Sequence, residues 1–244
     1  MIISHLSLSY HEKDILKNVN FELQEHLTIL GANGSGKSTL AKALCGLLTY
    51  QGSITINNQE LSDMPSKERA KLISYIPSKM QSFEQFTTVE DFVLLGRYPY
   101  KESYKDYTSD DKALVAQILQ ELNIHDLKKH KLQELSSGQQ QLTLIAQALS
   151  QQSKILIFDE PTSNLDPKNT LLFAKELQKL RQKYQTILIT HDIQLASHLN
   201  DPVLFIQDKK AEFFAEGFFQ TDRLEQAYGV TFTNTNGMIG ISYA

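Results

Sequence analysis

The chain has 244 residues and a formal net charge of −4, which suits one α/β domain or one core with a smaller helical insert. The slight acidity argues against a nucleic-acid surface, which usually shows as a basic face, so we expect no nucleic-acid partner. A single cysteine, Cys45, excludes an internal disulfide framework and a cysteine-based zinc cluster, and its apolar helical surroundings predict a buried small side chain.

The first ten residues lack the basic start and the apolar run of a secretory signal peptide. No apolar stretch approaches the ~18 residues that a membrane-spanning helix needs. We therefore expect a cytoplasmic protein, one that can still dock on a membrane partner.

Hydrophobic periodicity predicts strands and helices in the first third of the chain. The strands alternate apolar and polar residues, whereas the longer helix repeats its apolar residues at helical spacing. In chain order the predicted elements are a strand at 1–10, one or two strands at 19–31, a helix at 36–48, a strand at 52–57, and a short helix followed by a strand at 66–77.

The middle of the chain is predicted to be almost all helical. Its first helix begins like a capping box, because Thr87 and Glu90 are three residues apart. Strands are predicted on both sides of this stretch, which favours an insertion into a mostly parallel core. We therefore expect one α/β domain over 1–244, with a core at 1–79 and 151–244 and a helical subdomain at about 80–150, whose helices cover 87–99, 109–124 and 137–151.

The last third of the chain returns to strands. Two apolar runs end in polar residues, as buried parallel strands do. A long helix between them has Asp166 as its N-cap and Pro167 in its first turn. The predicted elements are strands at 154–161 and 185–192, the helix at 166–184, a hairpin at 201–217 that turns at 208–210, and a short helix at 221–229.

The stretch GANGSGKST follows a strand and opens a helix. It matches G-x-x-x-x-G-K-[ST], in which glycines let backbone N–H groups turn inward around phosphate oxygens. Lys37 would reach the β- and γ-phosphates, and Ser38 would offer a hydroxyl to Mg²⁺. A chance glycine-rich turn is the alternative. The predicted nucleotide-binding residues are Gly31, Ala32, Asn33, Gly34, Ser35, Gly36, Lys37, Ser38 and Thr39.

Acidic residues end the apolar strand ILIFDEP. A phosphate-binding loop of this kind needs a carboxylate on a neighbouring strand to hold Mg²⁺, and Asp159 fits. Glu160 would face the γ-phosphate and orient or deprotonate the attacking water. His191 ends the next apolar strand and would contact the γ-phosphate, because ligands bind at the carboxyl ends of parallel strands. The alternatives are an Asp–Glu pair at an ordinary strand–loop junction and a structural histidine.

The stretch LSSGQQQ, at 135–141, offers hydroxyls and amides but no acid, base or nucleophile. One interpretation is capping, with Ser136 or Ser137 as the N-cap of the helix that follows. The other is anion binding by the backbone N–H groups at the start of that helix. The stretch by itself leaves both interpretations open.

The chain resembles the ATP-binding cassette (ABC) ATPases over nearly its whole length. The resemblance rests on the order and spacing of five motifs, which are the phosphate-binding loop, LSSGQ, LIFDEP, SNLD and ITHD. The resemblance implies a P-loop core, an N-terminal antiparallel β portion, ATP with Mg²⁺, and two subunits facing head to tail. Each subunit then binds phosphate of its partner's ATP through its signature turn. Ser137 departs from the usual glycine, which a negative φ would tolerate. The signature residues are Ser136, Ser137, Gly138 and Gln139.

The resemblance implies further roles. Tyr10 is similar to the aromatic residue that stacks on adenine, with a plain strand-end tyrosine as the alternative. Asp166 resembles the loop residue that crosses the dimer and orients the opposite site. The stretches FVLLGRYPY, at 92–100, and LEQAYGVTF, at 224–232, resemble ATPase subunits of iron–siderophore, haem and vitamin B12 importers.

These resemblances imply the ATP-hydrolysing subunit of an importer, peripheral to the cytoplasmic face of the plasma membrane. A permease of separate chains would sit on the helical subdomain, and an external binding protein would choose the cargo. The alternatives are an ABC ATPase of a soluble complex and a scaffold that does not hydrolyse ATP. Glu160 argues against the scaffold, because degenerate sites commonly lose that acid.

One loop departs from the family pattern. The family usually has a glutamine after the strand at 73–77, but this chain has YIPSKMQ, with Ser78 at that position. The serine hydroxyl is too short to span the same gap to Mg²⁺ without a water. Gln81 is the nearest substitute, and a loop that still acts as a hinge with water filling the gap is the alternative.

Overall fold

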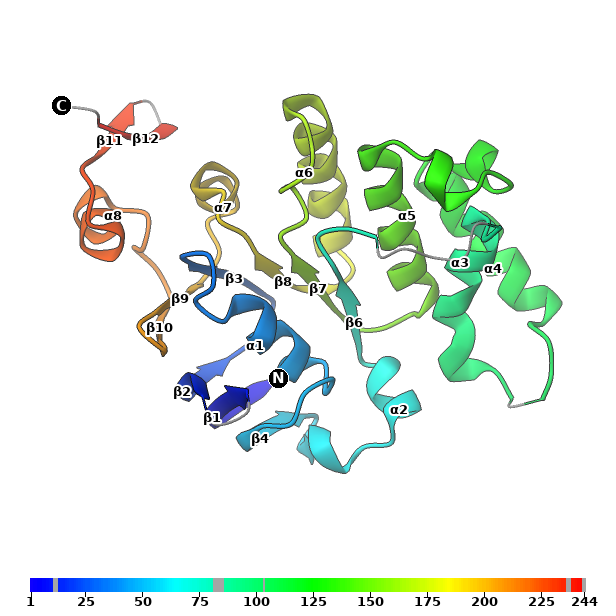
Figure 1. Cartoon of the computed structure of the whole chain (residues 1–244), viewed down its shortest axis with the longest axis horizontal. Helices are drawn as coiled ribbons and strands as arrows, with labels where there is room; N and C mark the ends of the chain where they lie inside the picture. The colour runs from blue at the N-terminus through cyan, green and yellow to red at the C-terminus, as the bar shows by residue number, and fades with distance from the viewer. Residues whose placement is uncertain (11–12, 81–85, 103, 236–237, 243–244) are drawn as a thin grey trace.

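The computed structural model describes residues 1–10, 13–80, 86–102, 104–235 and 238–242. Figure 1 shows two sheets with helix α1 (Lys37–Leu44) between them, and a group of helices beside the end of the larger sheet. Within the described residues, no helix is both long and apolar enough to cross a membrane.

The smaller sheet is the antiparallel portion that the family resemblance predicts. Its strands lie in the order β2-β1-β4-β5, and every pairing is antiparallel. Its apolar residues face α1, which also contacts β3 (His26–Gly31) and β7 (Ile155–Asp159) of the larger sheet. The strands are β1 (Ile2–Tyr10), β2 (Lys13–Glu22), β4 (Gln51–Ile56) and β5 (Gln59–Glu60).

The larger sheet has the order β10-β9-β3-β8-β7-β6 and confirms the prediction of a mostly parallel core. Only β10 runs antiparallel, to β9, and Asp208 and Lys209 turn between them with positive φ. Every residue of β7 is buried, as expected for a parallel strand covered on both faces. The strands are β3 (His26–Gly31), β6 (Ile73–Ile76), β7 (Ile155–Asp159), β8 (Gln185–Ile189), β9 (Val203–Gln207) and β10 (Lys210–Phe214).

Helices cover the larger sheet on both faces (Figure 1). The face opposite α1 packs against α6 and α7, and the Phe158 and Phe173 rings meet edge to face with centroids 5.8 Å apart. The described helices outside the middle segment are α1, the 3₁₀ helix η1 (Leu61–Asp63), α2 (Ser66–Ala70), α6 (Pro167–Arg181), α7 (Ile193–Leu199) and α8 (Thr221–Tyr228).

A helical segment separates β6 from β7, although these two strands are neighbours in the sheet. It packs against α6 in one shared apolar core. Thr88 rather than Thr87 caps its first helix, and Asp91 rather than Glu90 completes the capping box, so that prediction was wrong by one residue. The segment contains α3 (Val89–Leu94), the 3₁₀ helix η2 (Leu95–Tyr100), α4 (Ser109–Glu121) and α5 (Ser137–Ser150).

Some elements differ from the sequence predictions. The short helix α7 and the terminal hairpin of β11 (Phe232–Thr235) and β12 (Met238–Ile241) were not predicted. Both are too short for their periodicity to stand out, so tertiary packing decides them. Cys45 follows α1 and is partly buried against the apolar core that includes Leu40 and Leu44, and burial raises the pKa of its thiol.

Candidate active site

The phosphate-binding loop lies between β3, which ends at Gly31, and α1, which begins at Lys37. Gly36 is the N-cap of α1 and has φ 107°, a left-handed conformation that favours glycine. Gly31 has φ 151°, and a Cβ there would collide with the carbonyl oxygen of Ile206 in β9. The two glycines of the motif are therefore required by backbone geometry, as their spacing predicts.

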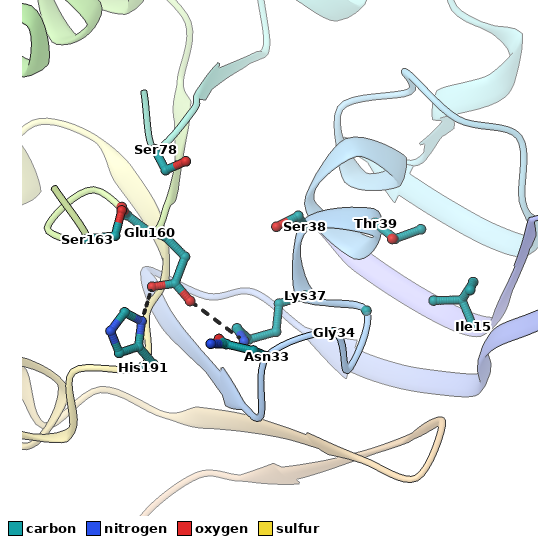
Figure 2. Close-up of a pocket in the computed structure, with 11 residues that line it drawn as sticks. Ile15, Asn33, Gly34, Lys37, Ser38, Thr39, Ser78, Glu160, Ser163 and His191 are labelled. Carbon is teal, nitrogen blue, oxygen red and sulfur yellow. Dashed lines mark hydrogen bonds and ion pairs between the residues drawn. The ribbon is translucent and has the colours of Figure 1, made fainter. Parts of the chain in front are cut away.

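A pocket of about 480 Å³ opens beside this loop. Figure 2 shows the α1 side of the pocket facing the residues that follow β7 and β8. The sequence motifs thus meet at the carboxyl edge of the parallel strands, where ligands of such sheets bind. Its lining residues are Ile15, Asn33, Gly34, Gly36, Lys37, Ser38, Thr39, Ser78, Glu160, Ser163 and His191.

The Lys37 ammonium is the buried positive charge of this pocket. Its side chain is 6% exposed, and Nζ donates hydrogen bonds to the carbonyl oxygens of Gly31 at 2.9 Å and Ala32 at 3.0 Å. Nζ also lies 3.6 Å from Oε1 of Glu160. A cation fixed in this way provides a charge for the phosphates of a nucleotide.

Glu160 is held from both sides. Its backbone has φ 51°, an uncommon conformation outside glycine, and its N–H donates to the carbonyl of Ile189 at 2.9 Å. Nδ1 of His191 lies 2.5 Å from Oε2 of Glu160, on the side of the carboxylate away from Lys37 (Figure 2). The carboxylate therefore has a defined orientation inside the pocket, which a base that positions water requires.

Asp159 is the last residue of β7 and is 5% exposed. Its Oδ1 accepts a hydrogen bond from the Ser38 hydroxyl at 2.9 Å, and its Oδ2 accepts one from the Tyr75 hydroxyl at 2.6 Å. Burial and the neighbouring Asp159 carboxylate raise the pKa of Tyr75. Sequence reasoning missed Tyr75; a polar aromatic residue inside the otherwise apolar strand ISYI was the available signal.

The donors at this point suit Mg²⁺. Ser38 and Asp159 supply a hydroxyl and a carboxylate in contact with each other. Within the described ranges, no group of three or more His, Cys, Asp or Glu side chains could hold a metal without other ligands. An incomplete set of oxygen donors fits Mg²⁺, which usually takes only one or two protein ligands and completes its shell with phosphates and waters.

The signature turn caps its helix. The Ser136 hydroxyl accepts from the Gln139 N–H at 3.4 Å, and Gln139 Oε1 accepts from the Ser136 N–H at 2.9 Å, so Ser136 rather than Ser137 is the N-cap. Ser137 begins α5 without a positive φ, so its backbone conformation accommodates a serine in place of the usual glycine. Of the described residues, none from this turn lines the pocket. A Cβ at Gly138 would instead meet Asn169, near the start of α6.

The remaining predicted residues lie around this centre. Asp166 caps α6 by accepting from the Asn169 N–H at 2.8 Å, and this bond holds the pKa of its carboxyl below the usual value. Tyr10 ends β1 with 67% of its surface exposed and is not among the described lining residues. Ala32 and Ser35 line an adjoining hollow on the other side of the loop. Gln81 lies outside the described residues.

Comparison with known proteins gives consistent matches. The ABC transporter family matches residues 16–163. A manganese transport system ATP-binding protein of Listeria monocytogenes is 34% identical over 94% of this chain and 96% of its own length. A protein of Helicobacter pylori named as a probable iron chelatin transport ATP-binding protein is 33% identical over 85% of this chain and 84% of its own.

A solved structure agrees with these matches. It is an inward-facing conformation of a protein assigned as a metal-chelate type ABC transporter. It superposes with a TM-score of 0.83 at 25% identity, covering 98% of this chain and 94% of that one. The chain therefore belongs to the ABC transporter family as an ATP-binding subunit, an ATPase whose hydrolysis is coupled to transport.

Proposed function

We propose that this ATPase powers an importer of a metal ion or a metal chelate. The observation that carries the ATPase chemistry is the Glu160 carboxylate, held between Lys37 and His191 in a pocket formed by the phosphate-binding loop. The manganese and iron chelatin relatives support the cargo class, as does the resemblance of 92–100 to importers of metal chelates.

In this proposal ATP binds along the loop at 31–39, with Tyr10 against the adenine. Lys37 releases its loop carbonyls and pairs with the β- and γ-phosphate oxygens. Ser38 and Asp159 would hold Mg²⁺, which would neutralise charge on the phosphates when bound. Glu160 accepts a proton from the attacking water, and the His191 ring keeps the carboxylate turned toward it.

A second copy of the chain completes each site. The signature turn caps α5 and lies outside the pocket of its own chain, so its N–H groups have no role in that pocket. The N-terminus of this 14-residue helix is suited to a phosphate group of ATP bound to the partner. Asp166 lies close by, across Asn169 from Gly138, and would orient the opposite site.

Transport requires partners that this chain does not contain. We propose that separate permease subunits in the membrane bind the helical segment at about 80–150, which acts as a subdomain of the single domain. The ATPase would then work on the cytoplasmic face of the plasma membrane, and an external binding protein would select the cargo. Nucleotide-driven closure of the dimer is the two-state element that such coupling needs.

Uptake measurements test this function. The gene is deleted in its host, and uptake of radiolabelled manganese, ferric siderophore, haem iron and cobalamin is compared with the parent strain. We expect one of these uptakes to fall, and we expect wild-type protein but not Glu160→Gln to restore it. If no uptake falls, while the purified protein hydrolyses ATP, the import of this cargo class is contradicted.

A further inference from the structure

We infer that Tyr75 positions the Asp159 carboxylate and thereby sets the affinity of the site for Mg²⁺. This inference rests on the proposed metal site formed by Ser38 and Asp159. Tyr75 is a positioning residue, because its hydroxyl bonds to the Asp159 carboxylate and it is not among the described residues that line the pocket.

The register of two parallel strands brings the groups together. Tyr75 of β6 is aligned with Ile157 of β7, and Asp159 lies two residues further along β7. Side chains two residues apart in a strand project from the same face. That face is the one covered by α1, since Ile157 belongs to the apolar cluster that includes Leu40 and Leu44, and Tyr75 packs against this cluster. Tyr75 therefore reaches along the face on which Ser38 also lies.

The two oxygens of Asp159 have separate donors. Oδ1 accepts from Ser38 at 2.9 Å, while Oδ2 accepts from Tyr75 at 2.6 Å. Asp159 is 5% exposed, so a lost donor would be replaced poorly by bulk water. With Oδ2 held on the β6 side, Oδ1 stays turned toward the Ser38 hydroxyl. Without the tyrosine hydroxyl, rotation of the carboxylate would separate Asp159 Oδ1 from the Ser38 hydroxyl and so disturb the pair of protein oxygens proposed to bind the metal.

The residue at position 78, three positions after Tyr75, makes the bond from Tyr75 to Asp159 more important. Ser78 stands where the resemblance predicts a glutamine, and in the described part of the chain the side-chain hydrogen bonds of Asp159 go to Ser38 and Tyr75, not to the short side chain of Ser78. Among residues 75–80, Tyr75 supplies the side chain that bonds to the proposed metal ligand. The segment therefore acts on the metal through a strand residue, three positions before the residue that the family pattern indicates.

Tyr75→Phe tests the inference, and Tyr50→Phe is the matched control. Tyr50 is also a half-buried tyrosine whose hydroxyl donates to a carboxylate, that of Glu60 at 2.8 Å, but Tyr50 and Glu60 are not lining residues of the nucleotide pocket. Each full-length chain is titrated with Mn²⁺ in the presence of a non-hydrolysable ATP analogue. Free Mn²⁺ is measured by electron paramagnetic resonance. Asp159→Asn gives the reference for a site that has lost its carboxylate.

We expect Tyr75→Phe to weaken Mn²⁺ binding about tenfold, the lower range for loss of a residue that orients a metal ligand. Binding of the analogue in EDTA should be unchanged, and Tyr50→Phe should match the wild type. In steady-state hydrolysis the Mg²⁺ concentration for half-maximal rate should rise, while the rate at saturating Mg²⁺ changes much less. If the hydroxyl had only a structural role, its loss would lower the melting temperature without changing the affinities measured in these metal titrations.

Wild-type Mn²⁺ affinity in Tyr75→Phe, with the expected loss in Asp159→Asn, would overturn the inference and leave the metal site standing. Wild-type affinity in Asp159→Asn would overturn the proposed metal site and the inference together. Tyr75→Met, which lacks the hydroxyl but keeps an apolar side chain of similar length, repeats the test if Tyr75→Phe does not fold. The same loss of Mn²⁺ affinity is expected for it, and wild-type affinity would again contradict the role.

Discussion

The side-chain amide of Asn164 donates a hydrogen bond to the backbone carbonyl of Ser78 at 3.3 Å. This bond joins the loop after β6, at the entrance to the helical segment, to the loop between Glu160 and Asp166. Both loops border the nucleotide pocket, since Ser78 and Ser163 line it. A displacement of one loop therefore acts on the other directly, through a contact that does not use the Ser78 side chain.

Ser78→Gln tests the departure from the family pattern. Loss of one polar contact to a charged centre costs about 1.5–3 kcal/mol where nothing replaces it. We expect Ser78→Gln to raise Mg²⁺-dependent ATPase activity or to tighten the Mg²⁺ requirement, and Gln81→Ala to change little. Steady-state rates titrated with Mg²⁺ decide between them. If Gln81→Ala abolishes activity and Ser78→Gln does nothing, the glutamine role belongs to Gln81.

Glu160→Gln is expected to keep ATP binding and to slow hydrolysis by about 10²–10⁴-fold, the usual contribution of a general base. The amide retains the size of the side chain but cannot accept a proton. Sedimentation with ATP and Mg²⁺ should then show a trapped dimer. Glu176→Gln, a change on α6 at an ion pair with Lys179, is the control and should hydrolyse normally. Hydrolysis at the wild-type rate would remove Glu160 from the catalytic role.

The signature turn should act on the partner's nucleotide. Lys37→Ala and Ser136→Arg each disable both sites of a homodimer. In a heterodimer of the two variants, one composite site carries both changes and the other carries neither. We expect mixing to restore ATP binding, with a maximum at equal amounts. An absence of recovery at every ratio, with both proteins folded, would contradict the head-to-tail arrangement.

The conformational stability of the helical segment should depend on Arg97. Its guanidinium donates to Asp111 at 2.7 Å and to the carbonyl of Ser150 at 2.8 Å, and both charged side chains are about nine-tenths buried. Because removing one partner leaves a buried charge unpaired, Arg97→Met should lower the free energy of unfolding by about 3–5 kcal/mol. Lys129→Met, at the surface pair with Glu90, should change little. Urea denaturation measures both.

The ion pair between Arg97 and Asp111 also predicts a pH dependence of conformational stability. Burial tends to raise the pKa of Asp111, but hydrogen bonds from Arg97 and Thr108 outweigh it, so the pKa lies below its usual value. A carboxyl with a lowered pKa stabilises the folded state above its unfolded-state pKa, and this contribution is lost as the pH falls through the folded-state value. The difference in stability between wild type and Arg97→Met should therefore be constant near neutrality and shrink below about pH 4. A difference independent of pH would contradict this account.

The sequence by itself determined the P-loop core and the identity of the residues that meet at its edge. The loop at 31–39 is contiguous, and its glycines are required by local backbone geometry. The motif can therefore be recognised from the sequence without knowledge of the fold. Asp159 ends an apolar strand, and Glu160 and His191 follow apolar strands. Parallel strands bring their carboxyl ends to one edge of a sheet. Alternating strands and helices were equally accessible, because each element carries its own hydrophobic period.

Only the tertiary structure decided the contacts between segments far apart in the chain. The bonds from Tyr75 to Asp159, from Asn164 to Ser78 and from Arg97 to Ser150 span 84, 86 and 53 positions. The Tyr75 bond depends on strand register, since a shift of one residue would turn the side chain to the opposite face of its strand. The other two bonds depend on how loops and helices pack against one another. No local pattern contains that information. The sequence therefore predicted which residues to expect at the site, whereas packing decided which neighbours orient them.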